Sequence, residues 1–228
     1  MSARVFPKLS EAPSLIPETT ASRRRDVFGA INSGIARRWT RECRRRRVGR
    51  AYDMALEIAR VIPRESKVLD VGCGNGLIAH HLSAMLGTSV VGIDLTKGCE
   101  APIDYRQYDG EEFPLPDDSF DAIISAYVLH HAQDVCTVLN EMKRVLRSGG
   151  VAVIYEDIPA TKWDRFVCSI HNRQWQARTG PCVFRIEPEW RALFESFGFE
   201  IINEKYLSRW RNVGHPVARV RFIVRPPT

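Results

Sequence analysis

Long apolar runs and an apolar leader are both missing from this sequence of 228 residues. No apolar run reaches the roughly 18 positions that a membrane-spanning helix needs. The first residues, Met1 to Val5, lack the apolar stretch of a secretory signal. We therefore expect a cytoplasmic protein without a membrane span.

The cysteines also lack a recognisable framework. None belongs to a Cys-x-x-Cys pair, and no set of cysteines and histidines has the spacing of zinc ligands. Scattered free thiols are typical of proteins in a reducing compartment, so we expect free cysteines and no metal site. The residues are Cys43, Cys73, Cys99, Cys136, Cys168 and Cys182.

Acidic residues are scarce in the first part of the chain. Residues 1–66 hold 15 Arg and Lys against 7 Asp and Glu, an excess of +8 in a chain whose net charge is +6. The excess is concentrated in two arginine runs, residues 23–25 and 44–47. Such runs can bind nucleic acid or an anionic surface, and they can equally form a solvated helix face. Both interpretations stay open, with nucleic acid the less favoured partner.

The organisation of the chain predicts one globular domain with an extension at its N-terminal end. Residues 1–22, rich in Pro, Ser, Thr and Glu without periodicity, predict a flexible arm. Residues 23–65 form a basic segment with helical periodicity from Asp26 to Ile62, which Pro63 is expected to end. We expect the folded domain at residues 66–228.

Strand and helix patterns alternate from residue 67 onwards. This alternation implies a parallel sheet covered by helices. The expected strands are residues 68–71, 89–94, 103–108, 120–126 and 151–155. The expected helices are residues 77–86, stopped by Gly87, and a second helix that Asp134 caps, whose apolar stripe ends at Leu146 and which Gly149 and Gly150 stop.

The end of the chain departs from this alternation. A helix at residues 189–197 precedes a strand at 199–206, and a second strand follows at 217–224. The link between these two strands, residues 207–216, is too short for a helical crossover. We therefore expect the last two strands to pair antiparallel.

A buried strand followed by a glycine-rich loop, residues 68–76 (VLDVGCGNG), is the most informative motif. Ligands of open α/β sheets bind beyond the carboxyl ends of the strands. Glycines let the backbone approach a ligand closely, and the following helix offers free amide groups. Asp94, at the end of the next strand, can accept hydrogen bonds from both hydroxyls of a ribose. The ligand is therefore expected to contain a nucleoside.

The spacing of the glycines distinguishes between two kinds of nucleoside ligand. A dinucleotide fingerprint of the form G-x-G-x-x-G/A that begins at Gly72 would need a small residue where this chain has Leu77. The negative charge of Asp70 beside the loop would repel a pyrophosphate. It would suit a ligand with an amino group and a sulfonium, which describes S-adenosylmethionine (SAM).

With these motifs in this order, the sequence resembles the class I SAM-dependent methyltransferases over residues 66–225. The resemblance implies an α/β fold with a Rossmann-like, doubly wound sheet of seven strands, mostly parallel with an antiparallel last strand, and helices on both faces. It also implies SAM as the cofactor and S-adenosylhomocysteine as its product. The matching segments are residues 70–76 (DVGCGNG), 92–94 (GID), 108–116 (YDGEEFPLP), 120–131 (FDAIISAYVLHH), 146–150 (LRSGG), 188–190 (PEW) and 194–199.

The resemblance also implies a cofactor site. It assigns Asp94 to the ribose and Asp109 to the adenine amino group, although Asp109 can instead cap a turn with Gly110. Ser125 and Ala126 are expected to line the reactive side of the cofactor through their backbone groups. The expected cofactor-binding residues are Asp70, Gly72, Cys73, Gly74, Gly76, Asp94, Leu95, Asp109, Gly110, Ser125 and Ala126.

Two further features bear on the acceptor side. His130 and His131 follow the fourth strand, where a histidine can act as a general base or can merely cap the next loop. Methyl transfer from a sulfonium needs alignment above all, so the sequence does not require a catalytic residue. The aromatic residues 158–187 are expected to shape a substrate pocket, with a packing flap as the alternative.

The acceptor has no motif of its own. The Asn-Pro-Pro-Tyr type of motif, which marks methylation of amino groups on bases, is missing from the sequence. We favour transfer to a small-molecule substrate by direct in-line displacement. Two alternatives remain: an RNA-directed methyltransferase whose arginine runs bind the backbone, and a SAM-binding protein without transferase activity. The sequence indicates no oligomeric state.

Overall fold

The computed structural model describes residues 20–227, with the side chains of Arg38 and of residues 40–227. The predicted flexible arm at residues 1–22 therefore lies almost entirely outside the described residues. The chain divides into two units, residues 1–47 and 48–228. Among the described residues, no helix is both long enough and apolar enough to cross a membrane.

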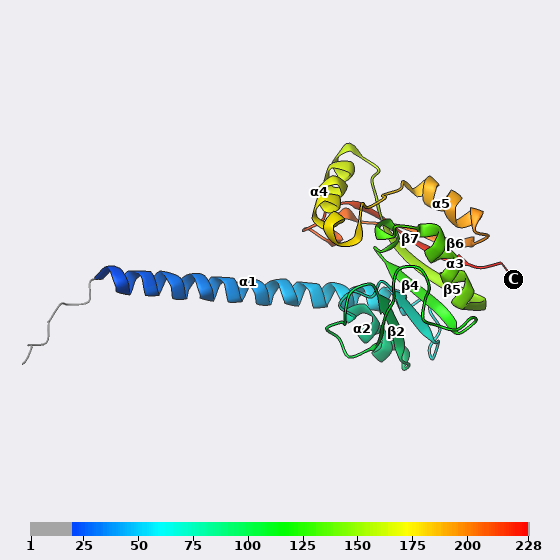
Figure 1. Cartoon of the computed structure of the whole chain (residues 1–228), viewed down its shortest axis with the longest axis horizontal. Coiled ribbons are helices and arrows are strands. Elements are labelled where there is room, and N and C mark those ends of the chain that lie inside the picture. Colours follow the sequence, from blue (N-terminus) through cyan, green and yellow to red (C-terminus); the bar gives the residue numbers. More distant parts are fainter. Residues whose placement is uncertain (1–19, 228) are drawn as a thin grey trace, which may run out of the picture. The chain divides into compact units, whose positions relative to one another are not determined.

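A seven-stranded sheet forms the centre of the second unit (Figure 1). Its spatial order is β3-β2-β1-β4-β5-β7-β6. Strands β1 to β5 pair in parallel, and β7 runs antiparallel to both β5 and β6. This confirms the expected Rossmann-like sheet with its antiparallel last strand. The strands are β1 (Val68–Val71), β2 (Val90–Asp94), β3 (Asp104–Gln107), β4 (Phe120–Ala126), β5 (Leu146–Ile158), β6 (Glu200–Leu207) and β7 (Ala218–Arg225).

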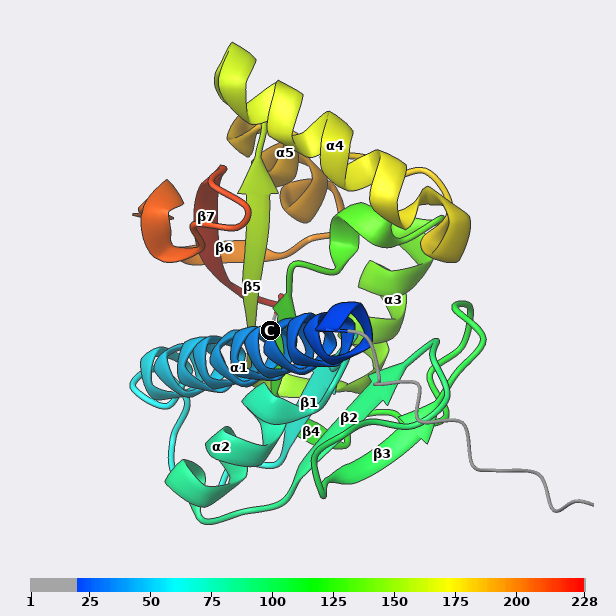
Figure 2. The same cartoon turned by 90° about the vertical axis from the view of Figure 1, so that its left-hand side faces the viewer.

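Helices cover both faces of the sheet. On one face, Met142 of α3 and Phe194 of α5 join the strands in a common core, and on the other Ile58 of α1 and Leu82 of α2 do the same. Figure 2 shows α4 beyond the carboxyl end of β5. The helices are α1 (Thr20–Ile58), α2 (Leu77–Leu86), α3 (Val135–Val145), α4 (Lys162–Thr179) and α5 (Glu187–Ser196), with short 3₁₀ helices η1 (Leu129–His131) and η2 (Arg209–Arg211).

The first helix ends earlier than its periodicity predicts. The sequence predicts an end at Pro63, but α1 stops at Ile58. The N–H groups of Val61 and Ile62 both donate to the carbonyl of Ile58, so the chain tightens into a turn. This turn keeps the side chain of Ile62 buried. Ile62 also precedes Pro63, and a residue before a proline rarely adopts helical backbone angles because of steric clash with the proline ring.

The junction between α3 and β5 also differs from the prediction. The pair Gly149–Gly150 does not stop the helix, because α3 already ends at Val145. Leu146 instead pairs with Phe120 as the first residue of β5, and the register then shifts so that Val151 faces Ala122. The strand bulges at this point. Leu146 is buried in the core at this position of β5, and its pairing with Phe120 replaces a further helical residue.

Candidate functional site

The loop between β1 and α2 is the first part of the candidate site. Gly72 and Cys73 donate their N–H groups to the carbonyl of Ile93, at 2.8 and 3.0 Å, which anchors the loop to β2. Gly72 (φ 69°) and Gly74 (φ 54°) adopt left-handed backbone conformations that suit glycine. A Cβ atom at Gly72 would lie 2.4 Å from Cγ2 of Val128, whereas one at Gly74 would meet nothing within 4 Å. The loop is therefore tightly packed at Gly72 and open beside Gly74.

The other two predicted residues of this loop, Cys73 and Gly76, contribute backbone geometry and packing. Gly76 is the N-cap of α2, with φ 74°. Burial raises the pKa of the Cys73 thiol, and the carboxylates of Asp70 and Asp94 raise it further. The thiol therefore stays protonated near neutral pH and is not poised as a nucleophile.

Two acidic residues flank the loop. Asp70 is buried, and its Oδ2 has no hydrogen-bond partner among the described residues. Burial, followed by the charge of Asp94, raises the pKa of the Asp70 carboxyl to about 8. Asp94 accepts hydrogen bonds from the N–H of Gly74 at 2.8 Å and from the N–H of Thr96 at 2.9 Å. The structure thus brings the glycine loop and both predicted acids together.

The predicted adenine-side residues lie on the loop that follows β3. Oδ1 of Asp109 accepts hydrogen bonds from the N–H groups of Glu111 and Glu112, at 2.9 and 3.3 Å, and these bonds hold the pKa of Asp109 below its usual value. Asp109 therefore caps a turn, and its side chain is exposed. A Cβ atom at Gly110 would lie 3.3 Å from Cδ2 of Leu95, so Leu95 borders the same loop.

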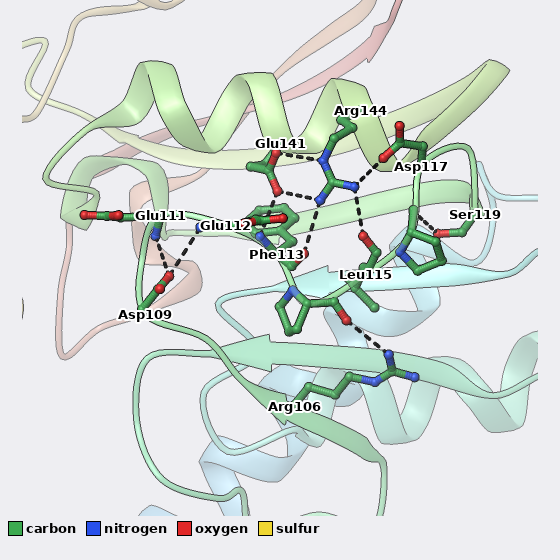
Figure 3. Close-up of polar contacts among 12 residues, drawn as sticks. Arg106, Asp109, Glu111, Glu112, Phe113, Leu115, Asp117, Ser119, Glu141 and Arg144 are labelled. Atoms are coloured by element: carbon green, nitrogen blue, oxygen red, sulfur yellow. Dashed lines mark hydrogen bonds and ion pairs between the residues drawn. The ribbon is translucent and has the colours of Figure 1, made fainter.

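Arg144 of α3 holds the segment that follows Asp109 (Figure 3). Its guanidinium donates to the carbonyl oxygens of Leu115 and Phe113, at 2.8 and 3.1 Å. It also forms ion pairs with Glu141 and Asp117, both at 2.6 Å. One side chain thereby fixes the path of this segment against α3.

The end of β4 carries the next predicted residues. Ser125 is fully buried opposite Val71, and its Oγ has no partner among the described residues. Ala126 ends the strand, and Tyr127 follows with φ 63°, a conformation that is unusual for an aromatic residue. The Tyr127 N–H donates to the carbonyl of Tyr155 at 2.8 Å, which helps to hold this turn. Backbone strain of this kind is often found at functional sites.

His130 and His131 lie in η1, directly after this turn. Nδ1 of His130 lies 2.6 Å from Oε2 of Glu156, whose Oε1 accepts from the N–H of Leu129 at 2.8 Å. Burial opposes protonation of His130, but Glu156 outweighs it, so the pKa of His130 lies above its ordinary value. Burial and the neighbouring histidines lower the pKa of His131 to about 3. His131 is therefore a neutral imidazole at pH 7.

The aromatic segment predicted to shape a pocket supplies neighbours for both histidines. Nε2 of His171, on α4, lies 3.1 Å from Nε2 of His131. The ring of Phe184 stacks on His130 with centroids 4.6 Å apart, and Trp175 stacks on His171 at 5.9 Å. The histidines thus belong to a group with α4, whereas Asp70 and Asp94 belong to the group around the glycine loop.

The sequence prediction missed the acidic end of β5. Its strand ended at residue 155, but Glu156 and Asp157 continue it and are both buried. Asp157 pairs with His215 at 2.8 Å and with Arg219 at 2.9 Å. Two acids directly after an apolar run, at the carboxyl end of a strand, were the signal available in the sequence.

The comparisons with known proteins agree with this geometry. A family model described as "Methyltransferase domain" matches residues 69–154, which run from β1 into β5. The ubiquinone/menaquinone biosynthesis C-methyltransferase UbiE of Xylella fastidiosa is 30% identical over 195 residues, which cover 78% of this chain and 72% of that protein. The sterol 24-C-methyltransferase of Pneumocystis carinii is 30% identical over 156 residues, but the chain spans only 41% of its length.

Solved structures share the fold at low sequence identity. A SAM-dependent methyltransferase of Methanosarcina mazei superimposes with a TM-score of 0.59 at 20% identity, covering 74% of this chain and 96% of that one. The [4+2]-cyclase SpnF superimposes with a TM-score of 0.61 at 18% identity, covering 78% and 82%. The topology of the sheet, the glycine loop and the sequence relatives all indicate the same family. The chain belongs to the class I SAM-dependent methyltransferases.

Proposed function

We propose that this protein transfers the methyl group of SAM to a small-molecule acceptor by direct in-line displacement. The observation that carries the proposal is the pair of acids beside the glycine loop. Asp70 is a buried carboxyl without a hydrogen-bond partner in the described part of the chain, and Asp94 is fastened to the N–H of Gly74. Such an arrangement suits a ligand with a positive charge and a ribose.

The residues present fit SAM. The open space beside Gly74 admits a ligand against bare backbone, and a cation placed near Asp70 would stabilise its ionised form. We assign Asp94 to the ribose hydroxyls, because each carboxylate oxygen can accept more than one hydrogen bond. The remaining cofactor contacts are proposed for Gly72, Cys73, Gly76, Leu95, Asp109, Gly110, Ser125 and Ala126.

Bound SAM supplies a methyl group that its sulfonium has already activated. The protein must then orient the acceptor and exclude water, and good alignment alone can contribute roughly 7–11 kcal/mol. Tyr127 is held in a strained conformation at the end of β4, and η1 follows it at once. We propose that His130 and His131 border the acceptor on this side.

Charge pairing favours a small molecule over RNA as the acceptor. In the described part of the second unit, many arginines are neutralised by acids. A surface of paired charges offers no continuous track for phosphates. The names of the relatives, which refer to sterol and quinone methylation, point the same way. The pairs are Arg144 with Glu141, Arg147 with Asp121, Arg191 with Glu204, Arg211 with Glu57, and Arg219 with Asp157.

The test supplies the purified protein with SAM and two fractions of a cell extract, one of small molecules and one of RNA. Formation of S-adenosylhomocysteine is measured for each fraction at a limiting SAM concentration, with the Asp94→Ala variant, which is expected to bind SAM more weakly, as the control. We expect product with the small-molecule fraction alone. Product with the RNA fraction alone would instead support the RNA-directed alternative.

A SAM-binding protein without transferase activity is the second candidate. The observation in favour of this candidate is the fold similarity to a [4+2]-cyclase, because a protein with the same architecture catalyses a reaction other than methyl transfer. Tight SAM binding without product from any fraction would favour this candidate.

A further inference from the structure

Three histidine side chains converge between η1 and α4. His130, His131 and His171 each place one ring nitrogen within 4.8 Å of the other two. Nε2 of His131 and Nε2 of His171 lie at hydrogen-bond distance from each other, 3.1 Å apart. Three imidazole side chains with ring nitrogens at such distances form a potential ligand set for a metal ion.

The rings of His130 and His131 are oriented by other groups through their second nitrogen. Nδ1 of His130 is held by Glu156 at 2.6 Å, and that carboxylate is itself fixed by the N–H of Leu129. Nδ1 of His131 lies 3.1 Å from Oγ1 of Thr179. Histidines that bind metals usually donate their free N–H to a carboxylate or another oxygen in this way, which fixes the tautomer and the ring orientation.

The third observation concerns the remaining nitrogen of His130. The residue is fully buried, yet its Nε2 has no hydrogen-bond partner among the described residues. A buried polar atom without a hydrogen-bond partner is energetically unfavourable, so a bound ligand or ion that interacts with this nitrogen would be stabilising. The other members of the cluster identify the position that it would take.

We propose that His130, His131 and His171 bind one divalent transition-metal ion, of which zinc is the best match, with one coordination position left open. Nitrogen ligands without a carboxylate disfavour Mg²⁺ and Ca²⁺ and suit zinc and its neighbours. Three protein ligands plus an open position is the arrangement of catalytic rather than structural zinc.

The distances within the cluster can be compared with those in a tetrahedral zinc site. Zinc–nitrogen bonds of about 2.1 Å place tetrahedral ligand atoms about 3.4 Å apart. Nε2 of His131 and Nε2 of His171, 3.1 Å apart, are already near this separation, and the ligand atoms of all three histidines lie within 4.8 Å of one another. His171, on α4, is half-buried, and a small shift of its side chain would adjust the position of its nitrogen.

Aromatic packing is the competing explanation for the cluster. Phe184 stacks on His130, and Trp175 stacks on His171. Packing alone leaves Nε2 of His130 without a partner, whereas an ion satisfies it. The aromatic rings would then exclude water from the site, and Glu156 would offset part of the positive charge of the ion.

The open coordination position of the proposed ion would allow it to bind the methyl acceptor. A bound ion would coordinate an oxygen or nitrogen of the acceptor and lower the pKa of a coordinated hydroxyl. This consequence rests on the proposed methyltransferase function, whereas binding of the ion does not. The substrate class that follows is an acceptor with a metal-binding oxygen or nitrogen next to the atom that receives the methyl group.

The experiment uses the full chain after removal of metals with a chelator. Zn²⁺ is titrated by calorimetry, Co²⁺ by its visible absorption, and Mg²⁺ serves as the hard-cation comparison. We expect one equivalent of Zn²⁺ or Co²⁺, ligand-field bands of four-coordinate Co²⁺, and no binding of Mg²⁺. His131→Asn and His171→Asn should each weaken Zn²⁺ binding by on the order of 100-fold or more, and Glu156→Gln by about 10–100-fold.

His80→Asn is the matched control. His80 neighbours His81 on α2, with ring centroids 5.6 Å apart, so this pair resembles His130 and His131 without belonging to the proposed site. Thermal melting establishes that each variant is folded. Absence of stoichiometric binding, or equal Zn²⁺ affinity in wild type, His131→Asn and His171→Asn, would overturn the proposed ion site.

SAM affinity, measured on the same metal-free samples, separates the two proposals. Tight SAM binding without Zn²⁺ binding rejects the metal site alone. Zn²⁺ binding without SAM binding rejects the proposed function and leaves the ion site standing. A loss of Zn²⁺ affinity in His80→Asn as large as in His171→Asn would mean that the ion binds elsewhere.

Discussion

Asp94 has two roles at the residue scale, because it fastens the glycine loop and is the proposed ribose ligand. The Asp94→Ala variant loses the bond to the Gly74 N–H as well as the proposed bonds to the ribose. Hydrogen bonds to charged groups contribute about 1.5–3 kcal/mol each. We therefore expect the affinity for SAM to fall at least about tenfold, the equivalent of about 1.4 kcal/mol, in a calorimetric titration.

The Asp94→Asn variant is the control for this prediction. It keeps one acceptor oxygen and the shape of the side chain but loses the charge, so it should bind SAM with intermediate affinity. A thermal unfolding curve for each variant confirms that the fold is retained. SAM affinity that does not change in Asp94→Ala would remove Asp94 from the cofactor site.

The raised pKa of Asp70 leads us to expect that cofactor binding depends on pH. Its pKa of about 8 in the free protein means that the carboxyl is mostly protonated at pH 7. A cationic ligand favours the ionised form, so binding should release a proton below pH 8. We expect the affinity for SAM to rise as the pH increases from 6 to 7, by up to about tenfold, because each pH unit below the pKa changes the ionised fraction tenfold.

Calorimetry in buffers of different ionisation enthalpy measures this proton release directly. The amino group of the ligand titrates near the pKa of an α-amino group, about 7.7–8.0, so it needs to be separated from Asp70. The Asp70→Asn variant does so, because it removes the carboxyl and keeps the ligand unchanged. Equal pH profiles for wild type and Asp70→Asn would contradict the assigned role of Asp70.

At the scale of elements, Arg144 links α3 to the segment that follows Asp109. It binds two carbonyl oxygens of that segment and two carboxylates, so one substitution releases several contacts. We expect Arg144→Ala to lower the free energy of unfolding by about 1–3 kcal/mol, since charged hydrogen bonds are lost and carbonyl groups are left unpaired. Urea denaturation measures this change.

The same substitution should weaken SAM binding, although Arg144 is not a proposed cofactor ligand, because the loop that carries Asp109 becomes less ordered. Arg191→Ala is the matched control, since Arg191 also pairs with two acids but lies on α5. It should leave SAM affinity unchanged. If Arg144→Ala lowers the affinity for SAM no more than Arg191→Ala does, the segment that follows Asp109 does not contribute to the cofactor site.

At the scale of the whole molecule, the arginine runs decide between a small-molecule and an RNA acceptor. Residues 44–47 are exposed positions of α1, and successive helical residues point about 100° apart. The run therefore surrounds the helix rather than forming one basic stripe, and Glu42 already pairs with Arg46. We expect no RNA complex beyond weak, non-specific binding at physiological salt.

Filter binding with total cellular RNA at two salt concentrations measures this property. Phosphate contacts make affinity fall steeply with salt, so true backbone binding would be recognisable. A variant with Gln at positions 44–47 should change solubility more than SAM affinity. A submicromolar, salt-dependent complex that this variant loses would favour the RNA-directed alternative instead.

The sequence by itself determined those features that depend on short-range patterns. The Gly74 and Asp94 motifs are found at neighbouring strand ends, Gly87 ends α2, and Asp134 caps α3 through the N–H groups of Cys136 and Thr137. Each of these signals acts within a few residues of its own position. The alternation of apolar segments determined the parallel sheet, and the short link before residue 217 determined the antiparallel pairing of β6 with β7.

The tertiary structure decided what depends on burial and on contacts between distant segments. Leu146 leaves its helix because it pairs with Phe120, and Glu156 becomes the partner of His130 because β5 continues past residue 155. His171 lies 40 residues beyond His131, so no local spacing relates the two. The sequence therefore indicated no relation between these histidines, and only the contact of α4 with η1 brings the imidazoles of His130, His131 and His171 within 4.8 Å of one another.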